Sequence, residues 1–136
     1  MDELKSLQKR HPGSSTICLM MGQVEEHFGK RKEAIEYYRQ ATSQNTVNSI
    51  SLFKLAENER KSGELKSAGE HYRQLLKAQP DFAPAKLGLA QCLEKDAPAE
   101  SARLAREYLK SNPEDTATIQ EAKRILKSAE AAKAAH

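Results

Sequence analysis

The sequence predicts an all-α chain made of repeated pairs of antiparallel helices, and two observations carry that prediction. The good helix formers Ala, Leu, Glu, Lys, Gln and Arg dominate the 136 residues, whereas there is no tryptophan and only 5% of residues are aromatic. A β-sandwich of this length would usually show more aromatic and β-branched residues in alternation. The second observation is an internal repeat with a period of 34 residues.

The repeat is clearest when residues 29–40, GKRKEAIEYYRQ, are set against residues 63–74, GELKSAGEHYRQ. Seven of these twelve positions are identical at an offset of 34 residues, in a stretch that is not of low complexity. Small residues recur at the same offset, and prolines recur near the ends of the copies, with Thr46 in the slot between the first two. The columns are Gly22, Ala56 and Ala90, then Ala34, Ala68 and Ala102, and the prolines are Pro12, Pro80 and Pro113.

This pattern resembles the tetratricopeptide repeat, a motif of 34 residues in which two antiparallel helices cross at small residues and a proline lies near the end. The resemblance implies a right-handed superhelical solenoid of about three repeats plus flanking helices. It predicts the second helix of a partial repeat at residues 1–13, and repeats at 15–48, 49–82 and 83–115, the last being one residue short. A capping helix or the start of a further repeat would follow at 116–136. We therefore expect the chain to be a fragment of a longer array.

The copies depart from the family pattern at three kinds of position, but the small-residue columns survive, so we expect the fold to survive too. The aromatic residue usually found near the start of the first helix and the tyrosine usually found later in it are both missing. The third copy also lacks the glycine that turns the chain. The residues in these places are Cys18, Leu52 and Lys86, then Glu25, Glu59 and Leu93, and finally Ala97.

Each copy is expected to form a helix, a short turn and a second helix. Ser14, Ser15 and Thr16 are candidates to cap the first helix, and Gly29 can adopt the left-handed conformation that ends it. The second helices are expected at about 32–43, 66–78 and 99–111. Pro84 suits the first turn of the third copy.

Small residues at the crossings let two helices approach closely, and larger side chains fill the space around them. Gly69 lies inside an expected helix, where glycine costs about 1 kcal/mol against alanine. A single helix pair cannot bury its apolar face alone, so neighbouring pairs must stack. The residues that we expect to define the fold are Gly22, Gly29, Ala34, Tyr38, Ala56, Gly63, Ala68, Tyr72, Pro80, Ala90, Ala102 and Pro113.

No residue pattern in the sequence indicates catalysis. The four histidines lie in no metal-ligand spacing. There is no nucleophile elbow, no glycine loop that would cradle a phosphate and no Cys–His signature. Neighbouring acids such as Glu25 and Glu26 are common on exposed helix faces. The chain is therefore predicted not to be an enzyme, and to need no cofactor or metal.

The charge pattern argues against a nucleic-acid or membrane partner. The net charge is only +3, and acids and bases are interspersed. The densest basic runs, residues 9–11 and 30–32, lie at expected helix ends, where basic groups interact favourably with the helix dipole. No apolar run approaches the roughly 20 residues of a membrane span, and no signal-peptide stretch opens the chain. Together with two distant cysteines, Cys18 and Cys92, this predicts a reduced, cytoplasmic protein.

The family resemblance implies a concave groove lined by the first helices of successive repeats. An apolar row, Leu19–Phe53–Leu87, would run along it with a mixed polar rim. Such a groove suits an amphipathic helix or an extended peptide of another protein. The alternative is that the row is repeat-to-repeat core, and periodicity does not decide between the two. The implied groove positions are Thr16, Leu19, Gln23 and Glu26, then Ile50, Phe53, Glu57 and Arg60, then Pro84, Leu87, Gln91 and Glu94.

One binding mode of the family is not expected here. Some relatives clamp the acidic C-terminal tail of heat-shock chaperones with lysine, asparagine and arginine side chains on their first helices. A two-carboxylate anchor needs several converging donors. Of the corresponding positions only Lys54 is basic, and neither Pro84 nor Gly88 can donate through a side chain. The two remaining positions are Leu19 and Gln23.

The leading functional prediction is a protein-interaction scaffold or adaptor that holds a peptide or helix of a partner in the groove. One alternative is an architectural spacer or self-association segment of a larger assembly. Another is a non-catalytic regulatory extension of an enzyme. Apolar surface exposed at the end of a repeat array would also favour end-to-end self-association.

Overall fold

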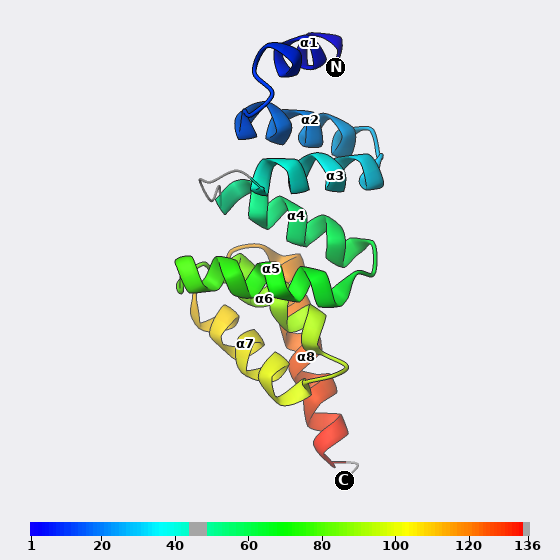
Figure 1. Ribbon diagram of the computed structural model, residues 1–136. Coiled ribbons are helices and arrows are strands. Elements are labelled where there is room, and N and C mark those ends of the chain that lie inside the picture. Colours follow the sequence, from blue (N-terminus) through cyan, green and yellow to red (C-terminus); the bar gives the residue numbers. More distant parts are fainter. Residues whose placement is uncertain (44–48, 135–136) are drawn as a thin grey trace. The chain divides into compact units, whose positions relative to one another are not determined.

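The computed structural model describes residues 1–43 and 49–134, and within them all regular structure is α-helical (Figure 1). The all-α, helical-repeat prediction is therefore confirmed. The end of the first expected repeat, which includes Thr46, lies outside the described residues. The helices are α1 (Asp2–Arg10), α2 (Ser15–His27), α3 (Arg31–Thr42), α4 (Ser49–Lys61), α5 (Leu65–Ala78), α6 (Ala83–Leu93), α7 (Pro98–Lys110) and α8 (Thr116–Ala134).

The helices group into two compact units, which we call unit 1 (Met1–Glu64) and unit 2 (Leu65–His136). In unit 1, α3 packs between α2 and α4, and α1 contacts α2. In unit 2, α6 packs against both α5 and α7, and α8 packs against α7 and also touches α6. The division falls inside the second expected repeat, 49–82, and the repeat boundaries remain a prediction.

The ends of several helices follow from residues that the sequence marks. The Ser14 hydroxyl accepts a hydrogen bond from the Ile17 N–H at 3.3 Å and so caps α2 as expected. Gly29 and Gly63 have φ angles of +75° and +85°, in the left-handed region that glycine adopts without strain. Asn112, just after α7, also has a positive φ, of 56°. Asparagine is one of the few other residues that tolerate this conformation.

The core of unit 1 is built around Tyr38, which is fully buried. Its ring lies on Gly22 of α2, where an added Cβ would come within 2.5 Å of the ring carbon Cε1. Tyr38 also belongs to a buried cluster with Ala34 and Leu55, against which Leu19 packs. Gly22 was expected to let two helix backbones approach, and here it makes room for a large side chain of α3.

Unit 2 contains a similar contact between Tyr72 of α5 and Gly88 of α6, in which a Cβ on the glycine would overlap the tyrosine ring. Gly69 differs, because a Cβ there would lie at ordinary van der Waals distance, 3.7 Å from Leu89 and 3.8 Å from Cys92. Pro80 and Pro113 lie just beyond the ends of α5 and α7. The remaining small residues of the predicted columns are all buried, namely Ala34, Ala56, Ala68, Ala90 and Ala102.

Candidate partner-binding face

The predicted groove residues lie on α2, α4 and α6, and we call the sides of these helices that carry them the first-helix face. In unit 1 this face is formed by α2 and α4. A carboxylate, Glu26, links the two helices, because it accepts hydrogen bonds from α4 as well as from α3. The face is therefore held together by polar contacts as well as by the apolar cluster beneath it.

Glu26 receives three donors. The Tyr38 hydroxyl donates to Oε2 at 2.6 Å, and the Asn58 amide donates to the same oxygen at 3.0 Å. The Lys54 ammonium lies 3.5 Å from Oε1. Asn58 is only 2% exposed, and its amide also donates to the Lys54 carbonyl at 2.8 Å. This network joins three helices of unit 1 through one acidic side chain.

The network shifts the ionisation of both its acid and its phenol. Burial alone would raise the pKa of Glu26, but the hydrogen bonds from Tyr38 and Asn58 and the charge of Lys54 outweigh it and lower the pKa overall. Burial, followed by the hydrogen bond to Glu26, raises the pKa of Tyr38. Glu26 is therefore held as a carboxylate, and Tyr38 as a neutral donor.

Several of the other predicted positions in unit 1 are open to solvent. Thr16 and Gln23 are exposed, and Ile50 is 59% exposed. Met20, which was not among the predicted positions, is 45% exposed on α2. The remaining positions are half-buried: Leu19, which packs on the core cluster, Phe53, and the pair Glu57 and Arg60, whose side chains lie 3.1 Å apart.

In unit 2 the first-helix face of α6 is covered in part by α8. Arg124 of α8 donates to both carboxylate oxygens of Glu94 at 2.8 Å and to Glu121 at 2.7 and 3.0 Å. The hydrogen bonds to Glu121 and Glu94 raise the pKa of Arg124. The Gln91 amide reaches Glu121 at 3.3 Å. Pro84 is exposed, whereas Leu87 is only 6% exposed, which favours the core alternative for this member of the apolar row.

Sequence reasoning placed Glu26 on this face but did not find its partners. The signal for Asn58 is that it stands in a repeat column whose other members, Val24 and Cys92, are apolar. A polar residue in an otherwise apolar column needs a buried hydrogen-bond partner. Lys54 was considered only for a chaperone clamp. Arg124 lies outside the three repeats, so no column could identify it.

The structure shows neither a metal centre nor a disulfide in the part of the chain that it describes. No group of three or more His, Cys, Asp or Glu residues is placed to hold a metal ion within residues 1–43 and 49–134. Cys18 and Cys92 are free thiols, and both are buried. Of the helices in the same ranges, none is both long and apolar enough to cross a membrane.

Paired helices, turn glycines and a repeated tyrosine-on-glycine contact define a helical-repeat protein. The family model of the tetratricopeptide repeat matches residues 19–81 and 53–116. The chain therefore belongs to the tetratricopeptide-repeat family. A search of curated proteins finds no significant match.

Several solved structures share the fold. MamA has 21% sequence identity and a TM-score of 0.73, over 82% of this chain and 61% of its own. The first tetratricopeptide domain of Spaghetti (RPAP3), bound to the HSP90 peptide SRMEEVD, has 16% identity and a TM-score of 0.77, over 89% and 94%. YrrB, described as having an unusual peptide-binding site, has 14% identity and a TM-score of 0.77, over 93% and 72%. At these identities the likeness shows the fold, and the chain spans less than two thirds of the MamA chain.

Proposed function

We propose that the chain is a non-catalytic, cytoplasmic protein-interaction module that holds a peptide or helix of another protein on the first-helix face of unit 1. The observation that carries the proposal is that this face leaves a large apolar side chain, Ile50, 59% exposed on a helix fixed from below by the Glu26 network. Membership of the tetratricopeptide-repeat family supports an interaction role. Two proteins of the same fold are described as peptide-bound or as having a peptide-binding site.

The composition of the face indicates what kind of partner it would take. Exposed Thr16 and Gln23 offer hydrogen bonds, while Ile50 and Met20 offer apolar area. A peptide or amphipathic helix with one or two apolar anchors and a polar flank matches this mixture. Neither a cofactor nor a nucleic acid is part of the proposal, because the face carries no excess of basic side chains.

We do not extend chaperone-tail binding to this chain. Lys54, which occupies a clamp position, already faces Glu26 of its own unit at 3.5 Å. Gly88, at another clamp position, lies beneath the ring of Tyr72. A second carboxylate brought to Lys54 would have to displace Glu26 or lie beside it, and both cost free energy. We expect the peptide SRMEEVD to show no micromolar affinity for the first-helix face in a calorimetric titration.

The proposal is tested with a variant that changes only exposed positions. Gln23→Arg combined with Ile50→Arg adds bulk and charge to the face without touching the core. The matched control is Gln74→Arg combined with Leu65→Arg, which makes the same changes at exposed positions of α5. A partner is captured from native lysate with the wild-type chain, identified by mass spectrometry and then assayed with each purified variant.

We expect the face variant to lose the identified partner and the control variant to keep it, with both retaining the wild-type circular dichroism. If the face variant keeps the partner, the binding surface lies elsewhere. If the wild-type chain captures nothing that withstands washing, the adaptor role fails, and the architectural spacer or regulatory extension becomes the better explanation.

A further inference from the structure

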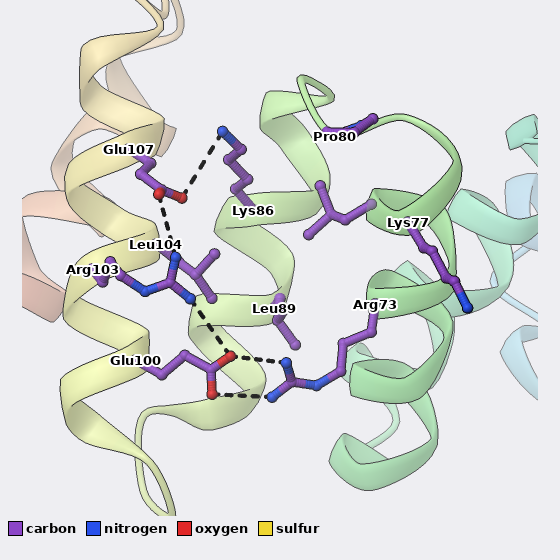
Figure 2. A pocket seen from close by; sticks show the side chains of 10 residues that line it. Arg73, Lys77, Pro80, Lys86, Leu89, Glu100, Arg103, Leu104 and Glu107 are labelled. Carbon is purple, nitrogen blue, oxygen red and sulfur yellow. Dashed lines mark hydrogen bonds and ion pairs between the residues drawn. The ribbon is translucent and has the colours of Figure 1, made fainter.

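A second candidate surface lies entirely within unit 2, in a groove between α5 and α7 with α6 beneath (Figure 2). The groove has a volume of about 410 Å³. Its floor is apolar and consists of Leu76, Leu89 and Leu104, one residue from each of the three helices. The proposed first-helix face uses none of these residues.

Ion pairs hold the two walls of the groove together. Arg73 of α5 donates to both carboxylate oxygens of Glu100 of α7, at 2.8 and 3.1 Å. Arg103 lies 3.7 Å from Glu100 and 3.3 Å from Glu107, so it joins the two acids along α7. The hydrogen bond from Arg73 lowers the pKa of Glu100. Figure 2 shows this chain of charged groups lying across the leucine floor.

The walls carry more positive than negative charge. Four basic residues and two acidic ones line the groove, a net charge of +2 on a chain whose total is +3. The two acids are shared mainly by the two arginines. Lys86 lies 3.9 Å from Glu107, at the outer limit of an ion pair, and Lys77 has no charged partner among the residues that the structure describes. The surplus charge is therefore carried by two lysines on the α5–α6 side.

We propose that this groove is a docking site for an acidic segment of a partner protein, with Asp or Glu side chains meeting Lys77 and Lys86 and an apolar side chain resting on the leucine floor. Charge complementarity selects an acidic occupant, and at low ionic strength it also speeds the encounter. The apolar floor adds a requirement that acidity alone does not meet.

A nucleic acid fits the groove less well than a peptide. Glu100 and Glu107 lie in the middle of the walls and would repel a continuous row of phosphates. Arg73, the residue best suited to bidentate phosphate recognition, already spends both of its donors on Glu100. A peptide can space its carboxylates so that they avoid these two acids and reach the lysines.

The test uses the full chain and a fluorescein-labelled peptide, DELLDE, with an amidated C-terminus, which removes any contribution from a terminal carboxylate. Binding is followed by fluorescence anisotropy at low salt and at about 0.15 M salt, where screening acts over roughly 8 Å. Three other labelled probes are measured beside it: DEAADE, which lacks the apolar anchor, KKLLKK, which reverses the charge, and a short single-stranded DNA.

We expect DELLDE to bind at low salt, to weaken as salt is added, and to bind more tightly than the other three probes. Lys77→Glu combined with Lys86→Glu should weaken binding by about tenfold or more, because the charge of the groove changes sign. The matched control, Lys123→Glu combined with Lys127→Glu on exposed positions of α8, makes the same change in total charge and should leave binding within about twofold.

Several outcomes would overturn the proposal: no binding of DELLDE, equal binding of KKLLKK or DNA, or an equal loss in the α8 control. If the double groove variant loses its helical circular dichroism, the exposed single change Lys77→Glu replaces it, with an expected weakening of about threefold. Binding of DELLDE that survives the groove variant but is lost in the Gln23→Arg, Ile50→Arg variant would assign the peptide to the first-helix face instead. Failure of this experiment leaves the adaptor role of unit 1 untouched.

Discussion

The two units secure their first-helix faces with central charges of opposite sign. In unit 1 the centre is the carboxylate of Glu26, which accepts from a tyrosine, an asparagine and a lysine. In unit 2 the centre is the guanidinium of Arg124, which donates to Glu94 and Glu121. The Arg124 side chain is 52% exposed, whereas one donor to Glu26, Asn58, is 2% exposed.

This difference in exposure sets how much each network contributes to stability. An exposed arginine between two carboxylates gains little, because water screens the charges and the long side chains lose freedom. A part-buried carboxylate that satisfies buried neutral donors is worth more, because removing it leaves those donors unpaired away from water. We infer that Glu26 stabilises unit 1 more than Arg124 stabilises unit 2, although Arg124 has the shorter contacts.

Beneath these networks the two units share one steric device, a tyrosine ring that lies on a glycine of a neighbouring helix. The pairs are Gly22 with Tyr38 in unit 1 and Gly88 with Tyr72 in unit 2. In both, a side chain larger than hydrogen on the glycine would overlap the ring. The cores are therefore alike where the polar networks differ, and substitutions can separate the two contributions.

The largest expected effect comes from the glycines. Gly22→Ala and Gly88→Ala should each destabilise the chain by about 1–2 kcal/mol, because the overlap with the ring costs roughly 1–3 kcal/mol and outweighs the gain in helix propensity. Gly69→Ala should stabilise it by about 0.5–1 kcal/mol, because its Cβ meets only ordinary contacts. Urea denaturation followed by circular dichroism measures all three.

Hydrogen exchange then assigns each effect to a unit. Faster exchange in α2 and α3 is expected for Gly22→Ala, and faster exchange in α5 and α6 for Gly88→Ala. Equal stabilisation by alanine at all three glycines would show that the rings move aside without cost, and the likeness between the two cores would then have no energetic meaning.

The sequence predicted much of this core, though not the contact that matters most in it. The 34-residue columns identified Gly22 as fold-defining because its counterparts Ala56 and Ala90 are also small. They did not identify Gly88, since the same column holds Met20 and Lys54. A column reports what all copies share. A glycine that accommodates a ring in one copy only depends on side-chain directions, which the period does not encode.

The candidate site was predictable to a similar extent. Repeat register placed Glu26, Ile50 and Gln91 on the first helices, but it could not rank them by exposure. Leu87 occupies the same register as Leu19 and Phe53 and is nonetheless almost fully buried, because three helices of unit 2 pack around α6. Contacts between helices that are distant in sequence, and so the partners of Glu26, follow from helix crossing, which a pattern within one repeat does not fix.

The next largest effect is expected at Glu26. Glu26→Gln keeps the size of the side chain but removes the charge that Lys54 meets and brings an amide N–H₂ against donors. We expect a loss of about 1–1.5 kcal/mol in the free energy of unfolding at neutral pH, from the weakened hydrogen bonds of Tyr38 and Asn58. Glu25→Gln, at the neighbouring position, is the matched control and should change stability by no more than about 0.5 kcal/mol.

The pH dependence of that loss provides a second check. The folded-state pKa of Glu26 lies below its ordinary value of 4.5, so its contribution is complete above that pH and disappears as the pH falls through the folded-state pKa. The difference between wild type and Glu26→Gln should therefore be constant from pH 8 down to about pH 5 and shrink in more acidic solution. A difference that stays constant to about pH 3 would show that the charge of Glu26 has no part in it.

The smallest effect is expected at Arg124, and it is the one that most directly tests the comparison between the units. Arg124→Gln breaks four hydrogen bonds of 2.7 to 3.0 Å at once, yet we expect a loss of only about 0.5 kcal/mol, because the guanidinium and both carboxylates regain water. The loss should fall further at about 1 M salt, where the Debye length is near 3 Å, whereas the loss in Glu26→Gln should change less because its donors are buried. If Arg124→Gln instead costs as much as Glu26→Gln and does so at both salt concentrations, exposure is not what separates the two networks, and the docking of α8 on α6 depends on this arginine.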